Sequence, residues 1–179
     1  MTPATQLLNS QSGNDMTFDV VDVRAILAHL REHTIERVIL SPKLWAECRL
    51  STNLQWTIVK YDKSEKDKLP ETTGVYTFIV KPGIANHPEC SYLLYVGKTD
   101  KQTLKARFLQ YFSEAKKKKG RAHIKLMLDV WKDHLWYCFA TIDDSSIIDD
   151  IENVLLSAYV PPMNREFKGI IGEARKAWS

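Results

Sequence analysis

Two tyrosines, an arginine and a glutamate have the residue types and the order needed to act on a phosphodiester. Tyr76 and Tyr95 lie in short apolar runs, Arg107 follows in a basic segment, and Glu152 lies further along the chain. Hydrolysis of a phosphodiester requires an activated water, a cation near the non-bridging oxygens and help for the leaving oxygen. Glu152 could hold one Mg²⁺ together with several waters, and Arg107 could donate paired hydrogen bonds to the phosphate.

A tyrosine can act as the base, or position the water, only if the pKa of its hydroxyl falls. A change from about 10 to about 7 corresponds to about 4 kcal/mol. We expect Lys98, Arg107 and a metal ion to supply this energy. The sequence does not decide which of the two tyrosines takes the proton. The alternative is that both pack in a core with their hydroxyls at its rim, as strand aromatics often do.

A hairpin and a helix are expected to position these side chains. Residues 75–80 and 92–96 are rich in β-branched and aromatic side chains, and turn-forming residues lie between them. This pattern predicts a β-hairpin with a long loop over residues 81–91. Directly after it, Thr99-Asp100-Lys101-Gln102 has the form of a capping box, which predicts a helix over about residues 100–118 with Thr99 as its cap.

The downstream sequence predicts two further helices and a strand. Apolar residues at helical spacing follow Gly120, residues 135–142 form a strand candidate, and residues 143–145 supply a cap for a helix that ends near Tyr159. Glu152 lies four residues after Ile148, at the buried edge of that last helix. A carboxylate at such a position needs a cation or hydrogen bonds, because burying it alone is costly. A salt bridge to a Lys or Arg is the structural alternative.

Residues 70–168 resemble the GIY-YIG nuclease superfamily. The resemblance is carried by motifs in the family's order: Gly74-Val75-Tyr76, Tyr95-Val96-Gly97, Arg107 with the Tyr111-Phe112 pair, Glu152, and Asn164 after Pro161-Pro162. It implies a small α/β domain with a central, mainly antiparallel three-stranded sheet flanked by helices.

The resemblance also implies a role for each matched residue. Tyr76 and Tyr95 would be the base-or-orienting pair, Arg107 the phosphate clamp, Glu152 the sole protein metal ligand and Asn164 the structural support of the site. Lys98 and Tyr111 are second-rank candidates for the catalytic set.

The function implied is a Mg²⁺-dependent endonuclease acting on DNA, of the restriction, repair or mobile-element type. Mn²⁺ could substitute for Mg²⁺, and RNA stays open as a substrate. A single site cuts one strand, so double-strand cleavage would require a homodimer or sequential events. Two alternatives belong to other classes: a nucleic-acid-binding module that kept the fold without cleaving, and a protein-interaction domain that has no affinity for DNA.

The positive charge is concentrated in one part of the chain. The formal net charge is +3, but residues 98–125 contain ten Lys or Arg and only two acidic residues. Such a cluster favours a phosphate backbone as partner, although a solvated lysine face is the alternative. The expected nucleic-acid contacts are Lys98, Lys101, Lys105, Lys116, Lys117, Lys118, Lys119, Arg121 and Lys125.

The remaining sequence defines the expected domain organisation. Residues 1–16 are expected to be a disordered tail, residues 17–70 an N-terminal α/β extension for capping, dimerisation or recognition, residues 71–168 the nuclease domain, and residues 169–179 a C-terminal helical tail. Within the extension, the sequence predicts a helix from Asp19 and strands over residues 37–40 and 56–61.

Several other classes of protein are not favoured. No apolar run approaches the roughly 20 residues that span a bilayer, and the N-terminus lacks the regions of a signal peptide. Three unpatterned cysteines indicate reduced thiols and a cytoplasmic location. Gly97-Lys98-Thr99 is no phosphate-binding loop, because position 92, where that motif requires glycine, is Tyr92. His29 and His33 fit a zinc pattern, but surface histidines on an amphipathic helix explain them better.

Overall fold

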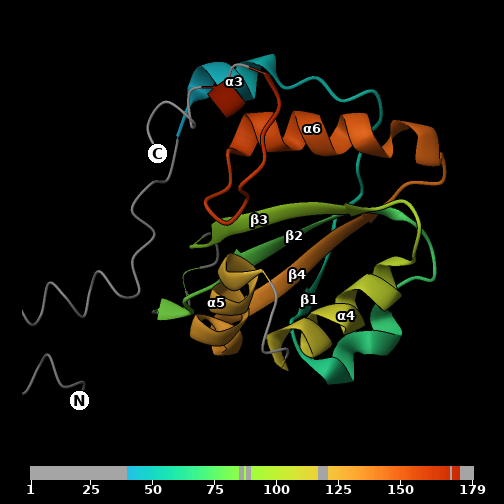
Figure 1. Cartoon of the computed structure of the whole chain (residues 1–179), viewed down its shortest axis with the longest axis vertical. Coiled ribbons are helices and arrows are strands. Elements are labelled where there is room, and N and C mark those ends of the chain that lie inside the picture. The colour runs from blue at the N-terminus through green and yellow to red at the C-terminus, as the bar shows by residue number, and fades with distance from the viewer. Residues whose placement is uncertain (1–39, 85–86, 88–89, 117–120, 170, 174–179) are drawn as a thin grey trace, which may run out of the picture. The chain divides into compact units, whose positions relative to one another are not determined.

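Four antiparallel strands form one sheet in the order β1-β4-β2-β3 (Figure 1). The computed structural model describes residues 40–84, 87, 90–116, 121–169 and 171–173. These residues belong to one of two compact units of the chain, residues 37–179. The strands are β1 (Thr57–Lys60), β2 (Gly74–Val80), β3 (Tyr92–Thr99) and β4 (Leu135–Thr141).

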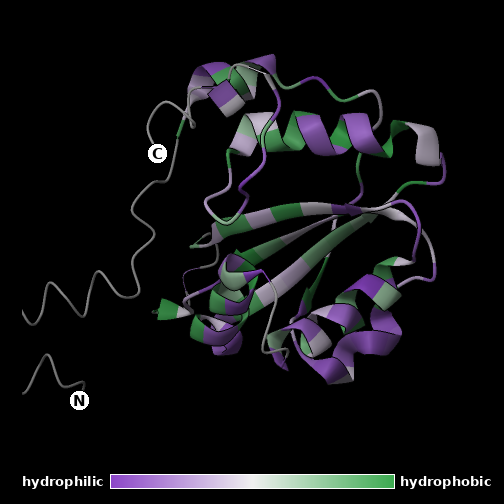
Figure 2. Cartoon of the chain, viewed as in Figure 1, coloured by the Kyte–Doolittle hydropathy of each residue, from purple (hydrophilic) through white to green (hydrophobic). Residues whose placement is uncertain are grey.

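Helices cover both faces of the sheet (Figure 1). On one face lies α6 (Ile148–Tyr159), with α3 (Pro42–Glu47) packed on it, and on the other lie α4 (Leu104–Lys116) and α5 (Ala122–Val130). Hydrophobic and hydrophilic residues alternate along α4 and α6 in Figure 2, as expected of helices that bury one side. Short 3₁₀ helices in the described part of the chain include η1 (Lys63–Lys68), η3 (Lys132–His134) and η4 (Ser145–Ile147).

The two faces of the sheet have different cores. Successive strand residues point to opposite faces, so Val75 and Tyr76 of β2 enter different layers. Val75 belongs to an aliphatic cluster that includes Ile151 and Leu155 of α6. Tyr76 belongs to an aromatic layer, in which its ring stacks on that of Tyr137 at 5.1 Å. The polar chemistry of the tyrosines is therefore confined to the layer between the sheet and α4.

The outer edge of β3 is closed by the segment that follows α6. The helix ends at Tyr159, and the next residue, Val160, has a φ of 44° that turns the chain back toward the sheet. Met163 N then donates to Leu94 O at 2.9 Å. The Asn164 side chain accepts from Val96 N at 2.9 Å and donates to Val96 O at 2.8 Å. One amide therefore satisfies both backbone groups of a buried residue that would otherwise present an open strand edge.

Most of the expected elements are confirmed, and two details were wrong. The hairpin, the two central helices, the strand 135–141 and the last helix are all present. Thr99 does not cap α4, because it is the last residue of β3; Thr103 does so by accepting from Ala106 N at 3.1 Å. The sheet has four strands instead of three, because the strand expected in residues 56–61 pairs with β4.

Other expectations lie outside the described residues. These are the tail 1–16, the helix from Asp19, most of the strand 37–40, His29 and His33, Lys117 to Lys119 and residues 174–179. Within the described part of the chain, no helix combines the length and apolarity needed to cross a bilayer. Cys48, Cys90 and Cys138 form no disulfide.

Replacing Asn164 should destabilise the fold. In Asn164→Ala, both backbone groups of Val96 lose a buried partner, so we expect the free energy of unfolding to fall by about 2 kcal/mol in urea titrations. Asn164→Asp keeps the acceptor for Val96 N but loses the donor to Val96 O at neutral pH, so its loss should be smaller. Equal stability of Asn164→Ala and the wild type would contradict this account of the β3 edge.

Candidate functional site

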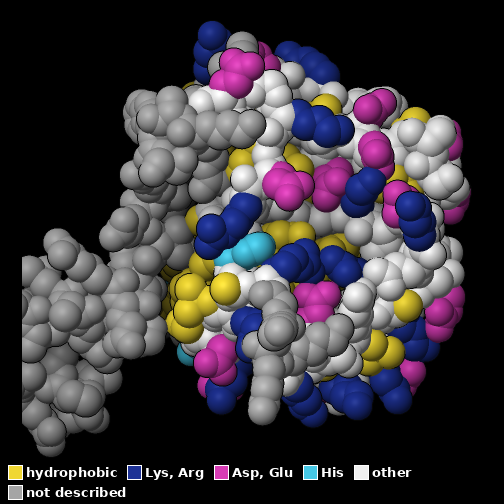
Figure 3. Space-filling view, viewed as in Figure 1, with side chains coloured by type: hydrophobic (Ala, Val, Ile, Leu, Met, Phe, Trp, Pro, Cys, Tyr) yellow, Lys and Arg dark blue, Asp and Glu magenta, His cyan; other side chains and the backbone are white. Residues whose placement is uncertain are grey.

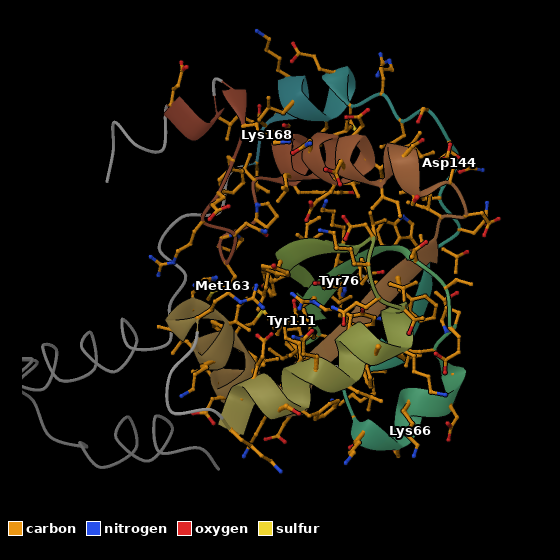
Figure 4. The ribbon with its side chains drawn as sticks, turned by 45° about the vertical axis from the view of Figure 1, so that its right-hand side comes forward. Lys66, Tyr76, Tyr111, Asp144, Met163 and Lys168 are labelled. Atoms are coloured by element: carbon orange, nitrogen blue, oxygen red, sulfur yellow. The ribbon has the colours of Figure 1, made fainter. Side chains whose placement is uncertain are left out.

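Three of the expected site residues form one hydrogen-bonded cluster. The hydroxyls of Tyr76 and Tyr111 lie 2.8 Å apart, and both rings are fully buried. Arg107 Nε donates to Tyr76 Oη at 2.9 Å, and Arg107 Nη2 donates to Tyr111 Oη at 3.3 Å. Tyr76 comes from β2, while the other two lie one turn apart on α4; Figure 4 shows Tyr76 and Tyr111 close together.

The guanidinium of Arg107 is held in place from several sides. Its Nη1 donates to Gln110 Oε1 at 2.8 Å and lies 3.7 Å from the Glu114 carboxylate. Its Cζ lies 4.8 Å from the centre of the Tyr111 ring, a cation–π contact. Helical spacing places Gln110, Tyr111 and Glu114 three, four and seven residues after Arg107, so a single helix face supplies all of these partners.

Gly97 makes the position of Tyr76 possible. The two residues are direct partners across the β2–β3 ladder. A Cβ at residue 97 would lie 2.5 Å from Tyr76 Oη and 2.6 Å from its Cζ, which is closer than such atoms approach. The Tyr76 side chain therefore lies across the glycine backbone, and this is the physical reason for a glycine in the second motif.

Tyr95 lies at the border of the cluster and has a second arginine as its neighbour. Its ring centre is 6.4 Å from that of Tyr76. Arg121 Nη1 lies 3.5 Å from Tyr95 Oη, and Arg121 Nη2 pairs with Glu114 at 2.8 Å. Arg121 was expected only as a nucleic-acid contact, and Gln110 and Glu114 were not predicted to lie at the site. Their i+3 and i+7 spacing from Arg107 was the available signal.

The tyrosine pKa values are raised by their surroundings. Burial raises the pKa of Tyr76 well above its ordinary value, and Tyr95 adds to this, while Arg107 acts in the opposite direction. Burial likewise raises the pKa of Tyr95 and Tyr111. Lys98 is not among the largest influences on these hydroxyls, and burial outweighs the effect of Arg107, so these two residues do not supply the lowering expected of them. All three hydroxyls keep their protons at neutral pH.

Lys98 and Glu152 lie on the other side of β3. Lys98 is the cross-strand partner of Val75, so it points to the face that α6 covers, and its Nζ pairs with Asp149 there. Asp100 lies 3.4 Å from the same Nζ. Glu152 follows Asp149 by one helical turn and is partly buried. Among the residues that the structure describes, Glu152 has no ion-pair partner, so the salt-bridge alternative for it is not found.

The Glu152 carboxyl is in an environment that disfavours its charge. Burial raises its pKa above the ordinary value, Lys98 opposes this, and Asp149 adds to it. Such a carboxylate gains most from a nearby cation. No group of three or more His, Cys, Asp or Glu able to hold a metal occurs within the described ranges. A metal site here would thus be a single carboxylate completed by waters, which fits Mg²⁺ and Mn²⁺.

The expected site residues thus form two groups that meet at adjacent residues of β3. Gly97 underlies the Tyr76, Tyr95, Arg107 and Tyr111 cluster, and Lys98 faces Glu152. No hydrogen bond or ion pair joins the two groups in the described part of the chain. Figure 3 shows Lys and Arg side chains beside carboxylates on the face between α6 and the α4–α5 layer. Asn164 holds the strand between the groups through Val96.

The residues expected to contact nucleic acid differ in exposure and in whether a carboxylate already pairs with them. Lys105 is paired with Asp67 at 3.6 Å and with Glu71 at 3.1 Å, so its charge is neutralised locally. Lys101, Lys116 and Arg121 are exposed and Lys125 is half-buried. Lys117, Lys118 and Lys119 lie outside the described residues.

Comparison of the chain with protein-family models, with curated proteins and with solved structures gives no match.

Adding a methyl group at residue 97 should disrupt the tyrosine cluster. Gly97→Ala places a Cβ against the Tyr76 ring, and we expect it to lower the free energy of unfolding by about 1–3 kcal/mol. In a Tyr76→Leu background the same substitution should cost clearly less, because the hydroxyl and the far end of the ring are gone. Urea titrations of the four proteins measure this coupling, and equal costs in both backgrounds would show that the contact is unimportant.

Removing the Glu152 charge should stabilise the protein. Because its pKa is raised in the fold, the folded state holds the proton more tightly than the unfolded chain, so stability falls as pH rises above about 4.3. We expect Glu152→Gln to have a higher Tm than the wild type near pH 7, with the difference vanishing toward about pH 4. Asp150→Asn, an exposed change on the same helix, should leave Tm unchanged at both pH values. A lower Tm for Glu152→Gln at neutral pH would contradict this.

Proposed function

We propose that this chain is a Mg²⁺-dependent endonuclease of the GIY-YIG type that hydrolyses DNA. The observation that carries the proposal is the hydrogen bond from Arg107 Nε to Tyr76 Oη, which is 2.9 Å long and partly buried between β2 and α4. Two residues distant in sequence, each named by a separate motif, are thus in direct contact. The Glu152 carboxylate of α6, which has no ion-pair partner among the described residues, adds the group that a metal-dependent hydrolase needs.

In this proposal Arg107 binds the phosphate whose ester is cleaved. A guanidinium has five N–H donors, and three hydrogen bonds, to Tyr76, Gln110 and Tyr111, hold it within the protein. The remaining donors can bind non-bridging oxygens. Because the side chain is already oriented, little reorganisation is needed as charge develops in the transition state.

The tyrosines would position the reacting groups and not act as preformed bases. Their raised pKa values keep Tyr76 and Tyr95 protonated, so each hydroxyl can donate to one oxygen and accept from another. Tyr76 is held between Arg107 and Tyr111, which orients its hydroxyl. Glu152 would hold the ion, and a bound Mg²⁺ would supply an acidified water and neutralise charge on the phosphate. Asn164 would act indirectly, by fixing β3 at Val96.

The alternative function is a nucleic-acid-binding module on the same fold that does not cleave. The observation that favours it is the raised pKa of every tyrosine in the cluster, because none of them is ready to take a proton from water.

Nicking of supercoiled plasmid in the presence of Mg²⁺ tests the proposal. We expect metal-dependent cleavage by the wild type, and losses of at least about 100-fold in rate for Arg107→Lys and Glu152→Gln, because each removes a group that acts on developing charge. Asp150→Asn is the matched control on α6 and should cut at the wild-type rate. Salt-sensitive DNA binding without any nicking would favour the alternative, and undiminished nicking by Glu152→Gln would place the chemistry elsewhere.

A further inference from the structure

Two arginines outside the catalytic cluster lie near consecutive residues of β3, one through its own side chain and the other through the residue that precedes it. Arg121 precedes α5, and its Nη1 lies 3.5 Å from the hydroxyl of Tyr95. Arg165 directly follows Asn164, whose amide is hydrogen-bonded to the backbone of Val96. Both arginines are exposed. Arg121 therefore reaches the Tyr95 hydroxyl, and Arg165 lies one residue from the amide that holds the next residue of β3.

The backbone that carries Arg165 is well fixed although its side chain is exposed. Met163 N donates a hydrogen bond to Leu94 O, and Met163 and Asn164 are each only 8% exposed. Binding of a ligand by Arg165 would therefore order a side chain only, without the cost of ordering a loop. Figure 4 shows the labelled residues Met163 and Lys168 at the two ends of this segment.

The charge in this region is not balanced. Glu114 is shared by Arg121, at 2.8 Å, and Arg107, at 3.7 Å. Arg165 forms no ion pair with any described residue, and the exposed carboxylate next to it in sequence, Glu166, forms none either. Two guanidinium groups thus share one carboxylate, and the third has no ion-pair partner among the described residues. Figure 3 shows basic and imidazole side chains grouped on this face.

His123, on the first turn of α5, lies within the electrostatic reach of both arginines. Its pKa is lowered first by burial and then by Arg165 and Arg121. The imidazole is therefore neutral at pH 7 and offers one N–H donor and one acceptor. Both arginines thus act on the same imidazole, as expected if one extended anionic ligand contacts all three residues.

We propose that Arg121, His123 and Arg165, which we call the basic strip, bind the sugar-phosphate backbone of the cleaved strand on one side of the scissile phosphate. This rests on the proposed function and adds the path of the substrate to it. The shared contact with Glu114 links the basic strip to Arg107, so neighbouring phosphates of one strand would meet Arg107 and then the basic strip. Arginine suits this task because it binds phosphate with two parallel hydrogen bonds.

The salt dependence of DNA binding tests the basic strip without requiring cleavage. We expect Arg165→Gln, made in the Glu152→Gln protein and measured with a fluorescent DNA duplex in EDTA, to reduce the slope of log K against log salt by about 0.9, the value of one lost phosphate contact. Arg49→Gln is the matched control, since Arg49 is an exposed arginine beyond α3. An unchanged slope for Arg165→Gln, or an equal loss for Arg49→Gln, would overturn the proposal.

A chemically neutral phosphate tests the position of the basic strip during cleavage. A methylphosphonate placed next to the cut, on one side only, should slow the wild type, and the same replacement on the other side should slow it much less. In Arg165→Gln, a methylphosphonate on the sensitive side should slow cleavage no more than one on the other side. Equal effects on both sides in the wild type would overturn the proposed path. A third outcome is that Arg165→Gln lowers the salt slope of DNA binding while the wild type cuts no substrate. This result would overturn the nuclease function and leave the basic strip as a DNA-binding surface.

Discussion

The arrangement of the candidate site depends on the close approach of the Tyr76 ring to the β3 backbone at Gly97. This contact exists because a cross-strand partner of Tyr76 lacks a side chain. With the ring lying across the neighbouring strand, its hydroxyl reaches Arg107 and Tyr111 on α4. The sheet and the helix are thus connected by a polar contact inside an aromatic layer. Such buried polar groups are tolerated because each has a partner of good geometry.

Strand β3 separates two groups of polar residues that differ in whether the protein itself compensates their burial. On the tyrosine side, the hydroxyls of Tyr76 and Tyr111 are hydrogen-bonded within the protein. On the α6 side, Glu152 is desolvated and has no ion-pair partner among the described residues. Stability is favoured by the first arrangement and reduced by the second. A fold that keeps a carboxylate in this condition gives up stability locally, which is the pattern expected where a site is organised for a ligand and not for the fold alone.

Much of the fold could be predicted from the sequence, because its signals are local. Short apolar runs rich in β-branched and aromatic residues define β2 and β3, and the spacing of Leu104 and Phe108 defines the buried side of α4. The details that were not predicted correctly depend on long-range contacts. One is the pairing of β1 with β4, and the other is the cap of α4, which is Thr103 instead of Thr99. The clustering of the tyrosines with Arg107 was expected from motif order. The direction of their pKa shift was not, since burial depends on packing partners that no motif names.

The order of the strands has a consequence for how the chain is made. β4 lies between β1 and β2, although it is the last strand to be synthesised. During translation the β2–β3 hairpin can close from local contacts, but β1 has no neighbour in the sheet until β4 leaves the ribosome. Until then the edge of β2 that later pairs with β4 carries unpaired backbone groups, and the aromatic layer lacks Tyr137. A nascent chain stalled before β4 would therefore be a natural client for chaperones that bind exposed apolar strands.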